Sequence, residues 1–159
     1  MEYCIREIEE RDNKAVEEII RYCLVEFGAD HEGCAWTDPC LDRFSQVYST
    51  YGNCYWVAED AAGKIVGGVG IGSFKDTPKI CELQKMYCLP EARGTGVANR
   101  LLQTALTYAK DYYRQCYLET FDNMIAAQKF YEKHDFYRIQ NPVLETGHYS
   151  CDVFYLKDL

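Results

Sequence analysis

The stretch Arg93-Gly94-Thr95-Gly96-Val97-Ala98 decides how this chain folds. It follows an apolar run over 80–89 and precedes the spacing of an amphipathic helix over 97–111. Two glycines let the backbone turn sharply and approach a ligand closely, so that N–H groups at the start of the helix face one anion. Arg93 adds a positive charge. The stretch therefore predicts a pyrophosphate-binding loop between a strand and a helix.

Two other phosphate-binding loops fit this stretch less well. No Gly-Lys-Ser or Gly-Lys-Thr triplet follows it, so the lysine and the magnesium ligand of a P-loop are missing. Gly94 and Gly96 also lack a third glycine at the spacing of a dinucleotide-binding fold. The remaining alternative is an ordinary glycine turn ahead of an amphipathic helix.

Three stretches together resemble one known family. Arg93, Gly96 and Ala98 match the pattern Q/R-x-x-G-x-G/A, which resembles the coenzyme A loop of the GNAT acyltransferase superfamily. Residues 82–90 resemble the fourth strand of that superfamily, and residues 117–136 resemble its fifth strand and the helix that follows. The three stretches keep the superfamily's order and spacing.

We expect residues 1–159 to form a single domain, because a chain of this length can bury one sizeable core. The resemblance implies an α/β fold: one mixed, mostly antiparallel sheet with flanking helices, in which a parallel fourth and fifth strand splay apart around the coenzyme A. Strand 80–89, helix 97–111 and strand 116–120 form the β-α-β unit of that fold. The other predicted elements are strands 2–8, 54–59, 64–74, 136–140 and 149–156, a helix that Asp12 caps and Gly28 ends, and helices 40–50 and 123–134.

Local signals add two expectations to this outline. The glycines of 67–72 are weak strand formers and predict a bend or close packing. Asp135 stands where the superfamily has glycine at a helix end, so we expect a left-handed backbone there.

Charge and composition narrow the class of partner. A net charge of −8 argues against nucleic acid and favours a cationic partner. We expect a cytoplasmic protein with no membrane partner, because the chain shows neither a secretory signal nor an apolar run of about 18 residues. The composition is compatible with both a monomer and a homodimer.

The cysteines predict reduced thiols and no metal. An odd number, nine, is scattered without a disulfide framework. His31, Cys34 and Cys40 lie close in sequence, but there is no C-x-x-C pair and no fourth ligand for a structural zinc site.

The resemblance implies an enzyme that moves an acetyl group from acetyl-CoA to an amine of a small molecule or peptide, by direct attack through a tetrahedral intermediate. Glu82 matches the strand glutamate that acts as the base in some members. The alternatives are that Glu119 or a water molecule is the base, or that Glu82 only forms a structural pair with a basic residue. Tyr131 stands at the position of the superfamily's general acid, unless it only packs beside Phe130. The implied contacts with the donor are Met86, Tyr87, Cys88, Arg93, Gly94, Thr95, Gly96, Val97, Ala98 and Asn123.

Several residues have more than one interpretation. Asn123 is either a helix cap or a ligand of the pantetheine amide. We expect a backbone N–H near Tyr87 or Cys88 to serve as the oxyanion donor, because a splayed strand has unpaired N–H groups to offer. Because no histidine matches a motif position beside Cys88 or Cys116, we do not expect an acyl-cysteine.

The acceptor side is the least determined part. His148 is a surface residue or an acceptor contact. The residues that would form the acceptor pocket, unless they are merely a solvated loop, are Asp30, His31, Glu32, Trp36 and Asp38. The functional alternatives are a non-catalytic acetyl-CoA-binding sensor or interaction module of the same fold, and a transferase of longer acyl groups.

Overall fold

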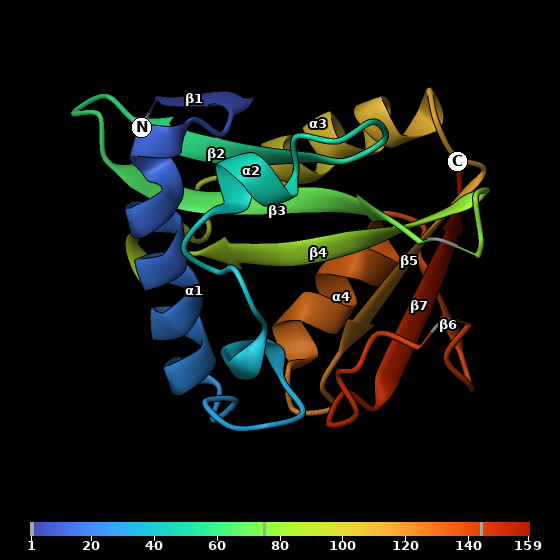
Figure 1. Cartoon of the computed structure of the whole chain (residues 1–159). Helices are drawn as coiled ribbons and strands as arrows, with labels where there is room; N and C mark the ends of the chain where they lie inside the picture. Colours follow the sequence, from blue (N-terminus) through green and yellow to red (C-terminus); the bar gives the residue numbers. More distant parts are fainter. Residues whose placement is uncertain (1, 75, 144) are drawn as a thin grey trace.

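A seven-stranded sheet forms the centre of the molecule (Figure 1). The structure is a computed structural model that describes residues 2–74, 76–143 and 145–159. The strands lie in the order β1-β2-β3-β4-β5-β7-β6, and all neighbours are antiparallel except β4 and β5. The mixed sheet with one parallel pair is thus confirmed. The strands are β1 (Tyr3–Glu7), β2 (Cys54–Asp60), β3 (Ile65–Ser73), β4 (Ile80–Cys88), β5 (Gln115–Thr120), β6 (Tyr137–Ile139) and β7 (Val153–Asp158).

Helices cover the sheet and bury their apolar faces against it. The helices are α1 (Asn13–Glu26), α2 (Phe44–Val47), α3 (Val97–Lys110) and α4 (Ile125–Lys133). Ile20 and Leu24 of α1 belong to one core cluster, whereas Leu101 and Leu102 of α3 belong to another. The spacing of four residues between Ile20 and Leu24 is that of one helix face. Within the described ranges, no helix combines the length and the apolar character needed to cross a bilayer.

The parallel pairing of β4 with β5 is confined to three residue pairs. Ile80–Glu82 pair with Gln115–Tyr117, and the rest of β4 has no partner on β5. β5 nevertheless stays paired with β7 as far as Thr120. The two strands therefore part beyond Glu82, as the resemblance implied.

Glycines of β3 make room for two tyrosines that support β4. A Cβ at Gly68 would lie 2.6 Å from the Tyr55 ring, and one at Gly70 would lie 2.8 Å from the Tyr48 ring. The Tyr55 hydroxyl donates a hydrogen bond of 2.8 Å to the carbonyl oxygen of Lys85. The predicted close packing is confirmed, and its effect is to fix the middle of β4.

A bulge in β4 lies at this supported position. The register shifts between Gly68 and Gly70, so that Lys85 and Met86 together face one residue of β3. Lys85 has φ +50, which few residues other than glycine adopt. The bulge breaks the alternation of side chains along β4.

Two predictions for the first half of the chain are wrong. Helix 40–50 is reduced to α2, because Cys40 has φ +66, which a right-handed helix cannot include. Asp12 does not cap α1: its carboxylate accepts hydrogen bonds from Arg6 and from the N–H of Glu9. Gly28 does end the helix, with φ +68.

The second half of the chain differs at two boundaries. The predicted strand 149–156 starts only at Val153, because a turn precedes it, in which the Cys151 N–H bonds to the carbonyl oxygen of His148. Asn123 is not a helix cap, since α4 starts at Ile125. Asp135 has φ +67, as expected for a left-handed helix end.

Candidate active site

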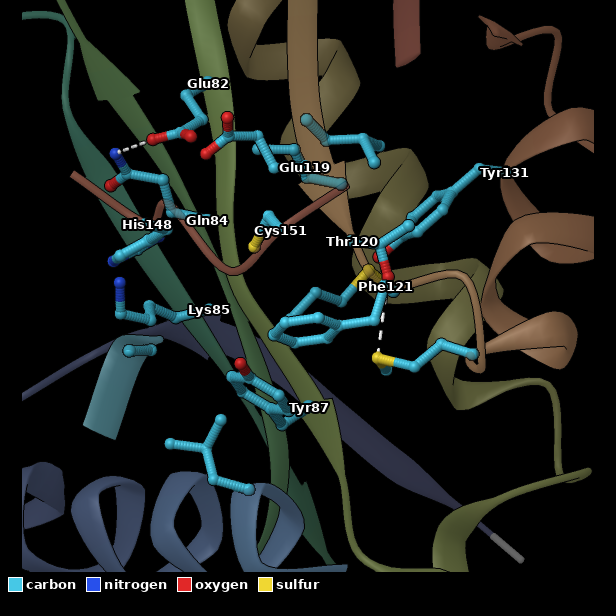
Figure 2. Close-up of a pocket in the computed structure, with 16 residues that line it drawn as sticks. Glu82, Gln84, Lys85, Tyr87, Glu119, Thr120, Phe121, Tyr131, His148 and Cys151 are labelled. Carbon is cyan, nitrogen blue, oxygen red and sulfur yellow. Dashed lines mark hydrogen bonds between the residues drawn. The ribbon is translucent and has the colours of Figure 1, made fainter. Parts of the chain in front are cut away.

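A cleft opens where β4 and β5 part, and both predicted catalytic residues line it (Figure 2). Glu82 lies at the last paired position of β4, and Tyr131 reaches the cleft from α4. Met86 and Tyr87 of β4 and Glu119 of β5 line it as well. The fold thus brings a carboxyl group and a phenol from distant parts of the chain to one cavity.

Glu82 is a buried carboxyl group at the root of the cleft, with 7% of the residue exposed. Gln84 Nε2 donates a hydrogen bond of 2.6 Å to Glu82 Oε1, and the Tyr48 hydroxyl donates one of 2.7 Å to Gln84 Oε1. No Lys or Arg of the described part forms an ion pair with Glu82. Burial raises the pKa of Glu82 to about 7 against the Gln84 hydrogen bond, and the charge of Glu119 adds to the rise. Such a group changes protonation state near neutral pH, as a general base requires.

Glu119 is the second carboxyl group of the cleft. The Tyr117 hydroxyl donates a hydrogen bond of 2.9 Å to its Oε2, and the Thr146 hydroxyl donates one to its Oε1. Glu119 is half-buried, whereas Glu82 is buried. The two carboxyl groups therefore differ in solvent access and in hydrogen-bond partners.

Asp38 joins β4 to the segment before β7 by an ion pair with Lys85 and a hydrogen bond with His148. Lys85 Nζ lies 2.6 Å from Asp38 Oδ2, and His148 Nε2 lies 2.8 Å from both Asp38 oxygens. Burial would raise the pKa of Asp38, but the His148 hydrogen bond and the Lys85 charge hold it below its ordinary value. Asp38 is therefore ionised at neutral pH, and it fixes both partners at one end of the cleft.

Tyr131 combines a packed ring with a hydroxyl that no described residue binds. Its ring centroid lies 5.6 Å from that of Phe130 and 5.8 Å from that of Phe136. No hydrogen bond to its hydroxyl is formed by the part of the chain that the structure describes. Burial raises the pKa of Tyr131 above its ordinary value, so the phenol stays protonated at neutral pH. The packing and the proton-donor interpretations are compatible.

The loop before α3 has the backbone expected of an anion site. Gly94 and Gly96 have φ +74 and +86, and nothing lies within 4 Å of a Cβ built on either. Helix α3 begins directly afterwards at Val97, and the first N–H groups of a helix have no partner inside it. Backbone N–H groups without a partner inside the helix therefore face open space at the position where the sequence predicts the pyrophosphate.

The side chain of Arg93 points to α1 rather than along this loop. Its Nη2 lies 2.6 Å from Glu26 Oε1, and its Nε donates a hydrogen bond of 3.0 Å to the carbonyl oxygen of Cys88. The guanidinium carbon also lies 5.7 Å from the ring centroid of Phe27. Arg93 braces the loop against α1, and this position differs from the expected role of a charge facing the pyrophosphate.

Most of the residues proposed for an acceptor pocket lie elsewhere. Asp38 lies beside the cleft, but Trp36 stacks with Arg21, whose guanidinium carbon lies 4.9 Å from the ring centroid. His31 lies 3.7 Å from Cys34 Sγ and lines a separate cavity together with Asn123. Asp30 and Glu32 are exposed, so for these two the solvated-loop alternative fits better.

Sequence reasoning gave no role to several residues that line the cleft, among them Gln84, Lys85 and Cys151. Alternation along a strand places Gln84 on the same face as Glu82, and this signal could have found it. Lys85 lies in the bulge, which breaks that alternation. Cys151 reaches the cleft through the turn that replaces the predicted strand.

Two cavities adjoin the cleft at the end where His148 lies, which we call the His148 end. One of about 320 Å³ is lined by Asp38, Glu82 and Glu145, among others. The other, of about 360 Å³, is lined by Glu119, Tyr149 and further residues. His148 lines both cavities and the cleft. A second ligand therefore has room at this end.

Comparison with known proteins decides the family. Residues 51–138 match the family model described as "Acetyltransferase (GNAT) domain". The chain belongs to the GNAT acetyltransferase family. An uncharacterized N-acetyltransferase of Escherichia coli K12, YjgM, is 39% identical over 158 residues, covering 98% of this chain and 94% of the relative. The prediction of an acetyl-CoA-dependent N-acetyltransferase is thereby confirmed.

Solved structures show the same fold. A GNAT-family acetyltransferase of Staphylococcus aureus Mu50 superposes with a TM-score of 0.87 at 23% identity, covering 99% of each chain. A phosphinothricin acetyltransferase of Sinorhizobium meliloti, solved in complex with AcCoA, gives a TM-score of 0.77 at 20% identity over 100% of this chain and 89% of the other. This chain therefore shares its overall fold with these acetyltransferases.

Proposed function

We propose that the cleft transfers an acetyl group from acetyl-CoA to a cationic amine, with Glu82 as the general base and Tyr131 as the general acid. The observation that carries this proposal is that both side chains line the cleft that opens where β4 leaves β5. One supplies a proton acceptor and the other a proton donor, and direct acetyl transfer to an amine needs both.

The loop before α3 is the part of the chain suited to the anionic end of the donor. The N–H groups of residues 94–98 and the positive end of the α3 dipole favour a pyrophosphate. The net charge of −8 makes this local arrangement necessary, because the protein as a whole repels an anion. Arg93 contributes by holding the loop, through Glu26 and the Cys88 carbonyl oxygen.

The unpaired edge of β4 is suited to the thioester end of the donor. Met86 and Tyr87 line the cleft beyond the last residue pair with β5. Backbone N–H groups that lack a strand partner are free to donate to the oxygen that becomes negative in the tetrahedral intermediate. We assign this role to an N–H near Tyr87 or Cys88.

Glu82 acts on the attacking amine. An alkylamine with a pKa near about 10 is almost fully protonated at pH 7. Glu82, with a pKa of about 7, accepts the proton, either directly or through a water molecule, and the neutral nitrogen attacks the thioester carbon. Glu119 lies closer to solvent and suits the binding of the amine as a cation better than the removal of its proton.

Tyr131 acts on the leaving group. When the tetrahedral intermediate collapses, the C–S bond breaks and the sulfur gains the electron pair. The Tyr131 hydroxyl gives its proton to that sulfur and recovers one from solvent. Burial raises the pKa of the phenol, but it also raises the proton affinity of a thiolate in the same cleft, so the two changes offset each other.

The charges at the His148 end suit an amine that carries a positive charge. Three carboxyl groups, Asp38, Glu82 and Glu119, border this end, together with the ammonium group of Lys85 and the imidazole of His148. The adjoining cavities of about 320 and 360 Å³ have room for a small molecule or for the end of a peptide.

The test measures free thiol released from acetyl-CoA with polyamines, amino acids, aminoglycosides and peptide N-termini as acceptors. For the best acceptor, Glu82→Gln should lower kcat/KM by roughly 100-fold or more near pH 7, and the defect should shrink as pH approaches the pKa of the amine. Tyr131→Phe should show a loss that persists over that range. Tyr51→Phe, at a side chain 89% exposed, is the matched control. Binding of acetyl-CoA without thiol release on any amine would favour a non-catalytic sensor instead.

A further inference from the structure

Three side chains of the metal-binding type meet at the His148 end of the cleft. The ligand atoms of Glu119, His148 and Cys151 all lie within 4.8 Å of one another, and each residue is half-buried (Figure 2). Glu119 comes from β5, whereas His148 and Cys151 come from the turn before β7. The fold therefore brings the three residues of this cluster together, and no local sequence motif predicts it.

The position of this cluster is as specific as its composition. Of the described residues that line the cleft, Glu119, His148 and Cys151 are also the ones that line the outer cavity of about 360 Å³. They form the wall between the two spaces. An ion bound to them would reach the site from solvent and would stand between the outer cavity and Glu82.

Neighbouring residues already hold two of the three side chains as metal ligands are usually held. His148 Nε2 bonds to Asp38, which leaves Nδ1 as the ring nitrogen able to bind a metal. A carboxylate behind a histidine in this way fixes the ring and raises the basicity of the free nitrogen. Glu119 is oriented by the hydroxyl groups of Tyr117 and Thr146.

We propose that Glu119, His148 and Cys151 bind a zinc-type divalent cation, and that this ion inhibits acetyl transfer by excluding the amine from the His148 end. The inhibitory part rests on the proposed function of the cleft, whereas the binding part does not. The proposed metal site departs from the expectation of no metal, because that expectation considered only residues close in sequence.

The donor set selects the kind of ion. One thiolate, one imidazole and one carboxylate suit Zn²⁺ and similar borderline ions, whereas Mg²⁺ and Ca²⁺ prefer oxygen ligands. Zinc bonds of about 2.0 to 2.3 Å place ligands in a tetrahedron roughly 3.5 Å apart, so the side chains must approach by about 1 Å. Three protein ligands leave a fourth position for water.

Binding exchanges a proton for the metal. Burial and the charge of Glu119 raise the pKa of the Cys151 thiol to about 12, so the free thiol is protonated. When the ion binds, the S–H bond breaks, the proton leaves to solvent, and the sulfur donates its electron pair to the metal, because a coordinated thiol is deprotonated. The same negative surroundings that disfavour a bare thiolate attract the cation.

The test for binding uses Co²⁺, because Zn²⁺ has no d-electron transitions. Titration of the whole chain should give one equivalent of bound Co²⁺ with a thiolate-to-cobalt absorption band, which Zn²⁺ then removes. Cys151→Ser should abolish the band, and His148→Ala and Glu119→Gln should each weaken binding at least tenfold. Asp38→Asn, behind His148, should weaken it by about 10- to 100-fold. These three variants keep the test valid if Cys151→Ser fails to fold.

Cys34→Ser is the matched control, because Cys34 contacts His31 and offers a competing pair of ligands. It should keep the band. A band that survives Cys151→Ser, or that disappears in Cys34→Ser, would refute the site. In the acetyl-transfer assay, Zn²⁺ should raise KM for the amine and leave that for acetyl-CoA unchanged, with full recovery on chelation. Inhibition of Cys151→Ser at the same Zn²⁺ concentration would refute the inhibitory role.

Discussion

The buried carboxyl group of Glu82 should make the stability of the protein depend on pH. Burial raises its pKa from 4.5 to about 7 in the folded state. The folded protein therefore binds this proton more tightly than the unfolded chain does. The stability that results is fully present below about pH 4.5 and is lost as pH rises through about 7.

The size of the effect follows from the shift. One pKa unit corresponds to about 1.4 kcal/mol, so the whole shift is worth roughly 3.4 kcal/mol, of which about 2.5 kcal/mol is lost between pH 5 and pH 8. Glu82→Gln replaces the carboxyl group with a neutral group of the same shape. Relative to the wild type, the variant should gain about 2.5 kcal/mol of unfolding free energy between pH 5 and pH 8.

The assay is equilibrium unfolding in urea at pH 5 and pH 8, with ionic strength held constant and a metal chelator present. Glu18→Gln, at an exposed position of α1, is the matched control and should follow the wild type at both values. If the difference in unfolding free energy between wild type and Glu82→Gln is the same at both pH values, Glu82 does not have a raised pKa, and the physical basis for its role as the base is refuted.

Two further predictions concern the donor loop and the thiols. Gly96→Asp should weaken acetyl-CoA binding at least 100-fold in calorimetry, because it puts a carboxylate where an anion is expected. Gly96→Ala is its control, with similar backbone strain but no charge. Equal losses of affinity in the two variants would show that strain rather than charge is responsible. Mass spectrometry after mixing with acetyl-CoA should find no stable acyl-cysteine, because burial raises the pKa of Cys88 to about 11, and the hydrogen bond with Cys81 together with burial raises that of Cys116 well above its ordinary value. A turnover-competent adduct would contradict direct transfer.

The parts of the site that follow from local sequence were predictable. The loop 93–98 needs left-handed glycines followed by a helix, and both requirements can be read from adjacent residues. The parting of β4 and β5 came from resemblance to a family rather than from any residue preference. Glu82 and Tyr131 were found because they lie inside stretches that resemble the family.

Contacts between distant segments could not be predicted in the same way. Asp38 and His148 are 110 positions apart, and Arg93 and Glu26 are 67 apart. Which of these charged residues meet depends on the path of the whole chain. Lys85 points to Asp38 only because a bulge interrupts the alternation of β4, and the bulge rests on glycines and tyrosines of other elements.

The confinement of β4–β5 pairing to three residue pairs has a mechanical consequence. The sheet consists of two half-sheets, β1–β4 and β5–β7, that are joined only by these three residue pairs at one end (Figure 1). Asp38 contacts Lys85 on the first half-sheet and His148, which precedes β7, on the second, and so it links the two half-sheets close to their junction. At this end the gap between the half-sheets is thus fixed both by strand pairing and by the Asp38 contacts, so the polypeptide sets its width there before a substrate arrives.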